Sequence, residues 1–303
     1  MKRFALIGAA GYIAPRHLKA IKETGNELVC ALDPYDGIGI LDSFFPQADF
    51  FTEPERFDRH LDKLRRNFEL KVDYVSICSP NYLHDAHIRM ALRNGANAIC
   101  EKPLVLNPWN LDALQEIEIE TGKKIYTILQ LRLHPTIQQL KKNIEEGPKD
   151  KVYDVDLVYI ACRGKWYFIS WKGDIHKSGG ISTNIGIHFF DMLGWIFGDF
   201  KGVEIYVNQP DKASGKLHFE KANVNWTLSV DENDLPQEAI EAKKRTFRKI
   251  IIEGQEMEFS EGFTDLHTSS YQDIMTGGGF GIEDARKSIQ IASRLRNQKS
   301  INI

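Results

Sequence analysis

The segment from Arg163 to Asp191 holds a dense set of side chains that can bind an anion and move a proton. It reads RGKWYFISWKGDIHKSGGISTNIGIHFFD. The pattern predicts a helix over 184–197 in which Asn184 and His188, four residues apart, share one face. Since the positive N-terminus of a helix disfavours protonation of a nearby histidine, His188 is expected to stay neutral and able to accept a proton. The basic residues of the segment that suit an anionic substrate are Arg163, Lys172 and Lys177. The alternative is a surface loop followed by a core histidine.

Composition restricts the class of protein. The chain has 303 residues, of which 42% are hydrophobic and 27% charged, with a formal net charge of −3. This length predicts two domains, and the composition is typical of a soluble globular protein. The charge argues against nucleic acid as a partner, and neither a membrane span nor a signal peptide is evident. The scattered cysteines, without CxxC spacing, are expected to be buried thiols of a cytoplasmic protein rather than disulfides or metal ligands.

A glycine-rich turn follows the first expected strand. The order is a strand over 4–7, the turn Gly8-Ala9-Ala10-Gly11-Tyr12-Ile13-Ala14, a helix over 15–23, and a strand over 28–32 that ends at Asp33. In this context the glycines let the backbone approach a pyrophosphate, and the helix N-terminus supplies N–H groups. Asp33 stands where a carboxylate binds ribose hydroxyls and repels a 2′-phosphate, which favours NAD over NADP. Ala10 departs from the motif, because it replaces the middle glycine.

Further strands and helices alternate up to residue 129. Strands are expected over 72–78, 98–100 and 125–129, with helices over 83–94 and from Asn107-Pro108 to Gly122. The alternation predicts an α/β fold with a doubly wound parallel sheet. The carboxyl ends of its strands carry Ser79-Pro80-Asn81, Glu101-Lys102-Pro103 and Gln130. Lys102 is a candidate to bind or deprotonate a hydroxyl, the alternative being a solvated lysine paired with Glu101.

The second half changes to period-two patterning. Residues 153–161 and 222–230 alternate apolar and polar side chains, and 246–253 with 255–260 predict a hairpin around Gly254. Long strands without helices between them predict an open, mostly antiparallel sheet. The helix over 184–197 is expected to cover one face and leave the other for a partner subunit, and a last helix is expected over 283–297. We therefore expect a Rossmann domain over 1–125 and an α+β substrate-binding and oligomerisation domain over 126–303.

With these residues assembled, the chain resembles the Gfo/Idh/MocA oxidoreductases over nearly its whole length. The matching motifs are the turn at 8–14, Glu101-Lys102-Pro103, and Gly179-Gly180 followed by Asn184-x-x-x-His188-x-x-Asp191. The resemblance implies that Lys102 and His188 flank the position of hydride transfer, and that the Lys102–Pro103 bond is cis. Many members have aspartate where this chain has Asn184. Since asparagine cannot take a proton, the acid–base work falls to Lys102 and His188, in an order that the sequence leaves open.

Within the family, 163–191 and the stretch from Leu266 to Gly281 are similar to UDP-N-acetyl-glucosaminuronate (UDP-GlcNAcA) 3-dehydrogenases of bacterial surface-polysaccharide synthesis. This resemblance implies NAD-dependent oxidation of the C3 hydroxyl of UDP-2-acetamido-2-deoxy-D-glucuronate, in lipopolysaccharide or O-antigen sugar biosynthesis. It also implies 2-oxoglutarate as a candidate acceptor that reoxidises bound NADH, and a homo-oligomer, with a tetramer favoured over a dimer. The alternatives are another sugar or polyol dehydrogenase, such as an inositol dehydrogenase, and a non-catalytic dinucleotide sensor.

The expected contacts fall into three groups, with no metal. The catalytic residues are Lys102 and His188. The expected cofactor contacts are Gly8, Ala10, Gly11, Tyr12, Ile13, Asp33, Ser79, Pro80, Asn81, His84, Glu101, Lys102, Gln130 and Trp166. The expected substrate contacts are Lys102, Arg163, Trp171, Lys172, Lys177, Ser178, Gly179, Asn184 and His188.

Overall fold

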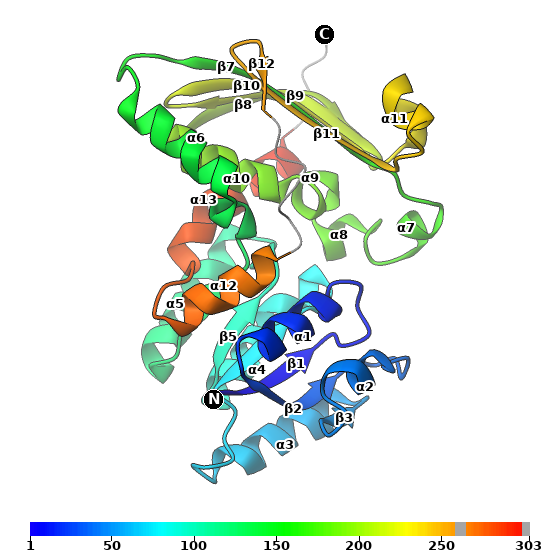
Figure 1. The fold of residues 1–303 in the computed structure, drawn as a ribbon, viewed down its shortest axis with the longest axis vertical. Helices are drawn as coiled ribbons and strands as arrows, with labels where there is room; N and C mark the ends of the chain where they lie inside the picture. The colour runs from blue at the N-terminus through cyan, green and yellow to red at the C-terminus, as the bar shows by residue number, and fades with distance from the viewer. Residues whose placement is uncertain (258–264, 299–303) are drawn as a thin grey trace. The chain divides into compact units, whose positions relative to one another are not determined.

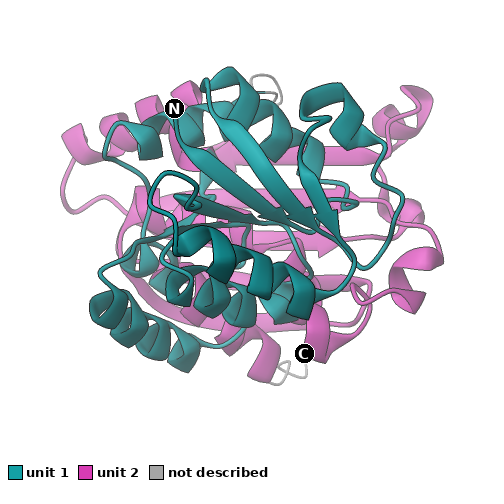
Figure 2. Cartoon of the chain, turned by 90° about the horizontal axis from the view of Figure 1, so that it is seen from below, with its two compact units in different colours: residues 1–130, 264–286 teal, residues 131–263, 287–303 magenta. Residues whose placement is uncertain are grey.

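A computed structural model describes residues 1–257 and 265–298, which form two compact units. Unit 1 holds residues 1–130 together with the described residues from 265 to 286 (Figure 2). Unit 2 holds 131–257 and 287–298. The sequence predicted a single division between 125 and 126; it gave no sign that a C-terminal segment returns to the first unit.

Unit 1 is built on a parallel sheet with the strand order β3-β2-β1-β4-β5-β6 (Figure 1). The strands are β1 (Arg3–Ile7), β2 (Glu27–Leu32), β3 (Asp49–Phe51), β4 (Tyr74–Ile77), β5 (Asn97–Cys100) and β6 (Ile125–Thr127). The predicted doubly wound sheet is thus confirmed. Because the strand order reverses between β1 and β4, the loops that follow these two strands border the position where such sheets bind ligands.

The helices of unit 1 begin and end where the sequence provides the signals. They are α1 (Ala14–Glu23), α2 (Ile40–Phe44), α3 (Pro54–Arg65), α4 (His84–Arg93), α5 (Pro108–Thr121) and α12 (Leu266–Met275), with the 3₁₀ helix η1 (Asn81–Leu83). α5 has its proline in the first turn and ends at Gly122, whose φ of 64° is left-handed, as the sequence predicted. α2, β3 and α3 were not predicted.

Unit 2 contains a mixed sheet with the order β12-β11-β7-β10-β9-β8 among the described residues. Its strands are β7 (Tyr153–Ala161), β8 (Phe200–Asn208), β9 (Lys212–Phe219), β10 (Ala222–Ser229), β11 (Thr246–Ile252) and β12 (Gln255–Glu256). Only the β7–β10 pair is parallel in this described sheet, so the prediction of a mostly antiparallel sheet is confirmed. The expected hairpin at Gly254 is present, but part of its second strand, 258–260, lies outside the described residues.

Helices cover one face of the unit 2 sheet. They are α6 (Pro135–Glu146), α9 (Gly180–Asn184), α10 (Ile187–Phe197) and the later part of α13 (Ile282–Asn297), whose apolar side chains form one core with β7, β9 and β10 (Figure 1). The remaining helical segments are η2 (Gln130–Leu133), α7 (Trp166–Ile169), α8 (Ile175–Ser178), η3 (Glu232–Asp234) and α11 (Gln237–Glu241). In the part of the chain that the structure describes, no helix is long and apolar enough to cross a membrane.

The single helix predicted over 184–197 is wrong, because α9 ends at Asn184 and α10 begins at Ile187. The N–H groups of Ile185 and Gly186 both donate to the carbonyl oxygen of Ile181, at 2.9 and 3.1 Å, which stops the regular ladder of helical bonds. At Gly186 an added Cβ would lie 2.7 Å from the Ser182 carbonyl oxygen and 2.6 Å from Leu228 Cδ1 on β10, so a side chain does not fit there. Asn184 and His188 therefore belong to two different helices.

Candidate active site

The glycine-rich turn after β1 runs against the end of β4. Gly8 has φ = +91°, and a Cβ added to it would lie 2.7 Å from the carbonyl carbon of Cys78. Only glycine permits this approach. The turn is closed by a hydrogen bond from Gly11 N–H to the Gly8 carbonyl at 3.1 Å. Beside the turn is a pocket lined by Ala9, Ala10, Gly11, Tyr12, Pro15, Arg16, Gly37 and Ile40.

Asp33 lies at the end of β2 and binds the turn directly. Its Oδ2 accepts a hydrogen bond from the backbone N–H of Ala10, and its Oδ1 accepts one from Tyr35 N–H, both at 2.9 Å. The side chain is buried. Each carboxylate oxygen has a second acceptor position. Asp33, which is predicted to bind the ribose hydroxyls, is thus held in place by the glycine-rich turn that is predicted to bind the pyrophosphate.

The segment after β4 is tied to the segment after β5 by a buried histidine. The ring nitrogens of His84 lie 2.8 Å from the Ser79 carbonyl oxygen and 2.7 Å from the Pro103 carbonyl oxygen. Burial lowers the pKa of His84, and the two carbonyl oxygens partly oppose that effect. Because the ring is fully buried and both nitrogens face the backbone, we interpret His84 as a residue that holds these loops. Ser79 and Asn81 are buried at the same strand end.

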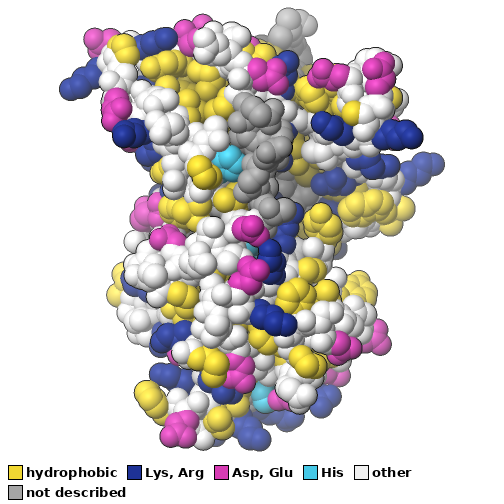
Figure 3. Space-filling model, viewed as in Figure 1, with side chains coloured by type: hydrophobic (Ala, Val, Ile, Leu, Met, Phe, Trp, Pro, Cys, Tyr) yellow, Lys and Arg dark blue, Asp and Glu magenta, His cyan; other side chains and the backbone are white. Residues whose placement is uncertain are grey.

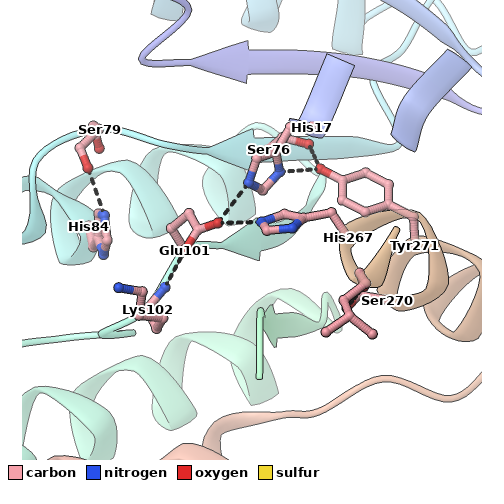
Figure 4. Close-up of polar contacts among 10 residues, drawn as sticks. His17, Ser76, Ser79, His84, Glu101, Lys102, His267, Ser270 and Tyr271 are labelled. Carbon is pink, nitrogen blue, oxygen red and sulfur yellow. Dashed lines mark hydrogen bonds and ion pairs between the residues drawn. The ribbon is translucent and has the colours of Figure 1, made fainter. Parts of the chain in front are cut away.

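Glu101 and Lys102 follow β5, and the Lys102–Pro103 peptide bond is cis, as expected. Glu101 Oε2 accepts a hydrogen bond from the backbone N–H of Lys102 at 3.2 Å. Its Oε1 lies 3.0 Å from His17 Nε2 and 2.9 Å from His267 Nε2 (Figure 4). Burial alone would raise the pKa of Glu101, but the hydrogen bonds from the two histidines outweigh it and lower the pKa well below the usual range.

The sequence assigned no role to His17 or to His267. The available signals were a histidine on the buried face of α1 and the quoted stretch at 266–271, neither of which indicates a carboxylate partner. At the end of unit 1, Gln130 Oε1 is buried and has no hydrogen-bond partner among the described residues.

The basic and aromatic residues predicted to bind substrate lie in unit 2. Arg163 donates to the carbonyl oxygen of Cys162 at 3.2 Å. Lys172 Nζ lies 3.9 Å from the centre of the Trp171 ring, a cation–π contact. Lys177 is half-exposed, with its Nζ 3.9 Å from Asp174 Oδ2. In Figure 3 lysine and arginine side chains gather near α7 and α11, and the exposed basic residues that flank these two helices in the sequence are Lys165, Lys243, Lys244 and Arg245.

The N–H groups of the turn between α8 and α9 are hydrogen-bonded within the protein: Ser178 N–H donates to the Asp174 carbonyl oxygen at 2.8 Å and Gly179 N–H to the Ile175 carbonyl oxygen at 2.9 Å. Gly179 has φ = +81°, and an added Cβ would meet the Thr183 side chain at 2.6 Å. The buried Ser178 Oγ accepts a hydrogen bond from Gly180 N–H at 3.0 Å and donates to the Asp174 carbonyl oxygen at 2.9 Å. Trp166, which begins α7, is 54% exposed and thus available to a ligand.

Asn184 and His188 are both partly exposed. Asn184 Nδ2 donates to the hydroxyl of the buried Tyr167 at 3.1 Å, which fixes the amide. His188 is the second residue of α10, so it lies near the N-terminus of a helix as the sequence predicted, but that helix begins at Ile187 and not at Asn184. Lys102 belongs to unit 1 and His188 to unit 2, and their joint action remains a prediction.

The four cysteines are buried and free, as the sequence predicted. Burial raises the pKa of Cys100 and Cys78 well above that of a free thiol. Thiolate chemistry at the end of β5 is therefore disfavoured.

The strand order, the turn after β1 and the acid after β2 define a dinucleotide-binding oxidoreductase fold. Residues 2–129 match the model of the oxidoreductase family with an NAD-binding Rossmann fold, and residues 141–233 match the C-terminal alpha/beta domain of the same family. The chain therefore belongs to the Gfo/Idh/MocA oxidoreductase family.

Two solved structures of the WlbA (WbpB) dehydrogenase from Thermus thermophilus are 51% identical to this chain. Each covers 100% of this chain and 97% of its own, with a TM-score of 0.96. One contains NAD and alpha-ketoglutarate, and the other NAD and UDP-GlcNAcA. The WlbA dehydrogenase of Bordetella pertussis has the same fold, with a TM-score of 0.79, 19% identity, and coverage of 97% of this chain and 94% of its own.

Among curated proteins, the Escherichia coli D-glucoside 3-dehydrogenase is 26% identical over 65% of this chain and 54% of its own length. The inositol 2-dehydrogenase of Rhizobium meliloti is 27% identical over 65% of this chain and 55% of its own. The match thus spans about half the length of these curated relatives.

Proposed function

We propose that the protein is an NAD-dependent dehydrogenase that oxidises the C3 hydroxyl of UDP-2-acetamido-2-deoxy-D-glucuronate to the 3-keto sugar. The observation that carries this proposal is the 51% identity over the full chain to a dehydrogenase crystallised with NAD and UDP-GlcNAcA. The product serves lipopolysaccharide or O-antigen sugar biosynthesis in the cytoplasm, and the enzyme is a homo-oligomer, a tetramer by resemblance.

The residues of unit 1 fit NAD. Gly8 keeps the turn open where any Cβ would clash, Asp33 offers acceptors for ribose hydroxyls, and Gln130 Oε1 is a buried acceptor without a protein partner among the described residues. Ala10, which replaces the middle glycine of the motif, is exposed in the turn. When bound, NAD supplies the hydride acceptor.

Lys102 and His188 carry the proton chemistry. One of them removes the hydroxyl proton as the C3–H bond breaks and its electron pair leaves as hydride. The Lys102 ammonium stabilises the alkoxide that develops on the oxygen. Asn184, held by Tyr167, orients the substrate or His188, because an amide cannot take up the proton.

The remaining predicted contacts suit the anionic groups of the substrate. A UDP-uronate has a pyrophosphate and a carboxylate, which Arg163, Lys172 and Lys177 can receive, with Ser178 and Gly179 in the turn beside Lys177. Trp171 offers a stacking surface for the sugar or uracil, and Trp166 one for the nicotinamide.

The cofactor is regenerated on the enzyme by 2-oxoglutarate. The hydride that C3 gave up passes to the keto carbon of 2-oxoglutarate, which with one proton becomes 2-hydroxyglutarate. The relative crystallised with NAD and alpha-ketoglutarate supports this second half-reaction.

The test is mass spectrometry of the purified protein incubated with UDP-GlcNAcA, NAD and 2-oxoglutarate. Formation of the 3-keto nucleotide sugar together with 2-hydroxyglutarate supports the full cycle. A keto sugar without 2-hydroxyglutarate keeps the dehydrogenase and contradicts the recycling. If neither product forms while the protein binds NAD, the proposed substrate is wrong, and another sugar, a polyol or a sensor role replaces it.

Variants locate the chemistry. Lys102→Met and His188→Asn are each expected to lower kcat by a factor of about 10² to 10⁴, the usual contribution of a positioned acid or base. The matched control is Lys149→Met, which removes an exposed lysine outside the site and is expected to keep the wild-type rate. Wild-type rates in Lys102→Met or His188→Asn would contradict the assignment.

A further inference from the structure

A buried hydrogen-bonded cluster surrounds the Glu101 carboxylate in unit 1 (Figure 4). Its members, named here the Glu101 cluster, are His17, Ser76, Glu101, His267 and Tyr271, none of which is more than 6% exposed. They come from α1, β4, the end of β5 and α12. The proposed reaction uses none of them directly, although Glu101 is the neighbour of Lys102.

The hydrogen bonds of the cluster have one consistent direction. An ionised Glu101 only accepts, so His17 and His267 both donate from Nε2 to Oε1. Burial lowers the pKa of His17, so its ring is neutral and has only this proton. His17 Nδ1 must then accept from the Tyr271 hydroxyl at 2.7 Å, and the Tyr271 oxygen accepts from Ser76 Oγ–H at 2.6 Å.

This direction agrees with the state of Tyr271. Burial raises the pKa of Tyr271 well above the usual value, so its hydroxyl keeps the proton that it donates. The chain of donors therefore runs from Ser76 through Tyr271 and His17 to Glu101, where it ends on a single buried negative charge.

Three side chains of the Glu101 cluster resemble a metal site. Ligand atoms of His17, Glu101 and His267 all lie within 4.8 Å of one another. The second ring nitrogen of His267 argues against this. Nδ1 is buried and has no hydrogen-bond partner among the described residues. A histidine bound to a metal through Nε2 would leave a buried N–H there without an acceptor, whereas such ligands almost always donate that proton.

The cluster is linked to the Lys102 peptide. Glu101 Oε2 accepts the Lys102 N–H at 3.2 Å, and beyond Lys102 the Pro103 carbonyl oxygen lies 2.7 Å from His84 Nδ1. Both ends of the Lys102–Pro103 unit are thus attached to buried side chains. The direction in which the Lys102 side chain leaves the backbone depends on these attachments.

We propose that the Glu101 cluster positions Lys102 for the dehydrogenation, with His267 of α12 acting directly on Glu101 and Tyr271 of α12 acting through His17 and Glu101. This inference rests on the proposed function. His267, His17 and Tyr271 are positioning residues, since they act on Lys102 through Glu101 and not on the substrate.

The test compares three variants of α12. His267→Leu removes the donor to Glu101, His267→Gln replaces it with an amide N–H of similar reach, and Ser270→Ala is the matched control. Ser270 is buried on the same helix, but its hydroxyl donates only to the Leu266 carbonyl oxygen of that helix.

We expect His267→Leu to lower kcat at least about tenfold, the effect of losing a hydrogen bond to a charged group. KM for UDP-GlcNAcA and the Kd for NADH should change less than about twofold, because neither proposed binding site contains His267. The effect of the substitution is therefore expected in kcat alone. His267→Gln should recover most of the rate, and Ser270→Ala should match the wild type. If His267→Leu does not fold, Tyr271→Phe provides the test, because it deletes one hydroxyl and keeps the ring.

Hydrogen exchange of the Lys102 amide gives a readout that needs no substrate. Exchange at Lys102 is expected to accelerate in His267→Leu and in Glu101→Ala, and to remain slow in His267→Gln. The wild type could fail to oxidise UDP-GlcNAcA while Lys102 exchange is still faster in these variants. That combination would support the positioning role and contradict the proposed substrate.

Three results would overturn the inference: an unchanged kcat with unchanged Lys102 exchange in His267→Leu, an equal loss of NADH binding and of kcat, or a stoichiometric metal ion in the purified wild type.

Discussion

A buried ion pair in unit 2 makes a quantitative prediction about stability. Arg132, in η2, donates from Nε to Asp191 Oδ2 at 3.0 Å and from Nη2 to Oδ1 at 2.8 Å. The side chains are 7% and 3% exposed, and the guanidinium carbon lies 5.9 Å from the centre of the Trp195 ring. Asp191 is on α10, one turn after His188. The perturbation we consider is Asp191→Leu, which removes the charge at similar volume.

The expected cost is large, because the substitution leaves a buried guanidinium without its carboxylate. Breaking one partner of a buried pair typically destabilises a protein by about 3–5 kcal/mol. For a unit of this size that corresponds to a fall in Tm of about 6–20 °C, at about 2–4 °C per kcal/mol. Arg132→Met combined with Asp191→Leu removes both charges and should cost much less than the sum of the single changes.

The assay is urea unfolding and calorimetry of the wild type, both single variants and the double variant. The matched control is Asp199→Asn, which breaks the exposed pair of Asp199 with Lys287, joined at 2.7 Å in the same unit. Since solvent screens this pair, the control should leave the unfolding midpoint nearly unchanged. NADH binding, which we assign to unit 1, should survive in all the folded variants.

The reasoning would be refuted by a cost for Asp191→Leu below about 1 kcal/mol, the range of exposed pairs. Additive effects of the two substitutions would refute it equally, because the argument requires the two charges to compensate each other.

Three further predictions concern unit 1. Gly8→Ala should lower the free energy of unfolding by about 2–5 kcal/mol, from left-handed backbone strain and from overpacking against the Cys78 carbonyl, and should weaken NADH binding. A urea unfolding curve equal to that of the wild type would contradict this prediction. Asp33→Asn should raise the Kd for NADH about tenfold, because the amide cannot accept hydrogen bonds from both backbone N–H groups. It should also improve NADPH binding relative to NADH, because the neutral amide does not repel a 2′-phosphate, and calorimetric titration measures both effects. Burial lowers the pKa of His87 to about 4 from 6.5, so below pH 6.5 the unfolded chain takes up the proton first and the folded state loses stability down to about pH 4. At about 1.4 kcal/mol per pH unit this amounts to about 3 kcal/mol, and His87→Gln should show a correspondingly smaller loss between these pH values in urea unfolding.

The features that the sequence predicted correctly depend on neighbouring residues. The turn that begins at Gly8, the acid at the end of β2 and the proline and glycine that bound α5 each follow from local backbone requirements. The family motif gave the cis bond before Pro103 in the same way. These requirements can be recognised without knowing what packs against the segment.

The helix break at Gly186 could not be recognised in this way. Residues 184–197 have a pattern that favours one continuous helix, and glycine is tolerated inside helices. A side chain at Gly186 would meet the nearby Ser182 carbonyl oxygen and also Leu228 of β10, which lies 42 positions further along the chain. The register of that contact follows from the packing of α10 against the sheet, which no local pattern specifies.

Motif spacing also leaves open whether a residue faces the substrate or the core. Asp191 was quoted in the same motif as Asn184 and His188, yet its carboxylate is buried on Arg132, 59 residues away. His17 and Tyr271 are 254 residues apart and meet beside Glu101. In both cases a buried charge must find its partners, and the partners come from wherever the fold brings donors together. The sequence can therefore indicate which residue types carry the chemistry, but the side chains that hold them in place emerge only when distant elements pack.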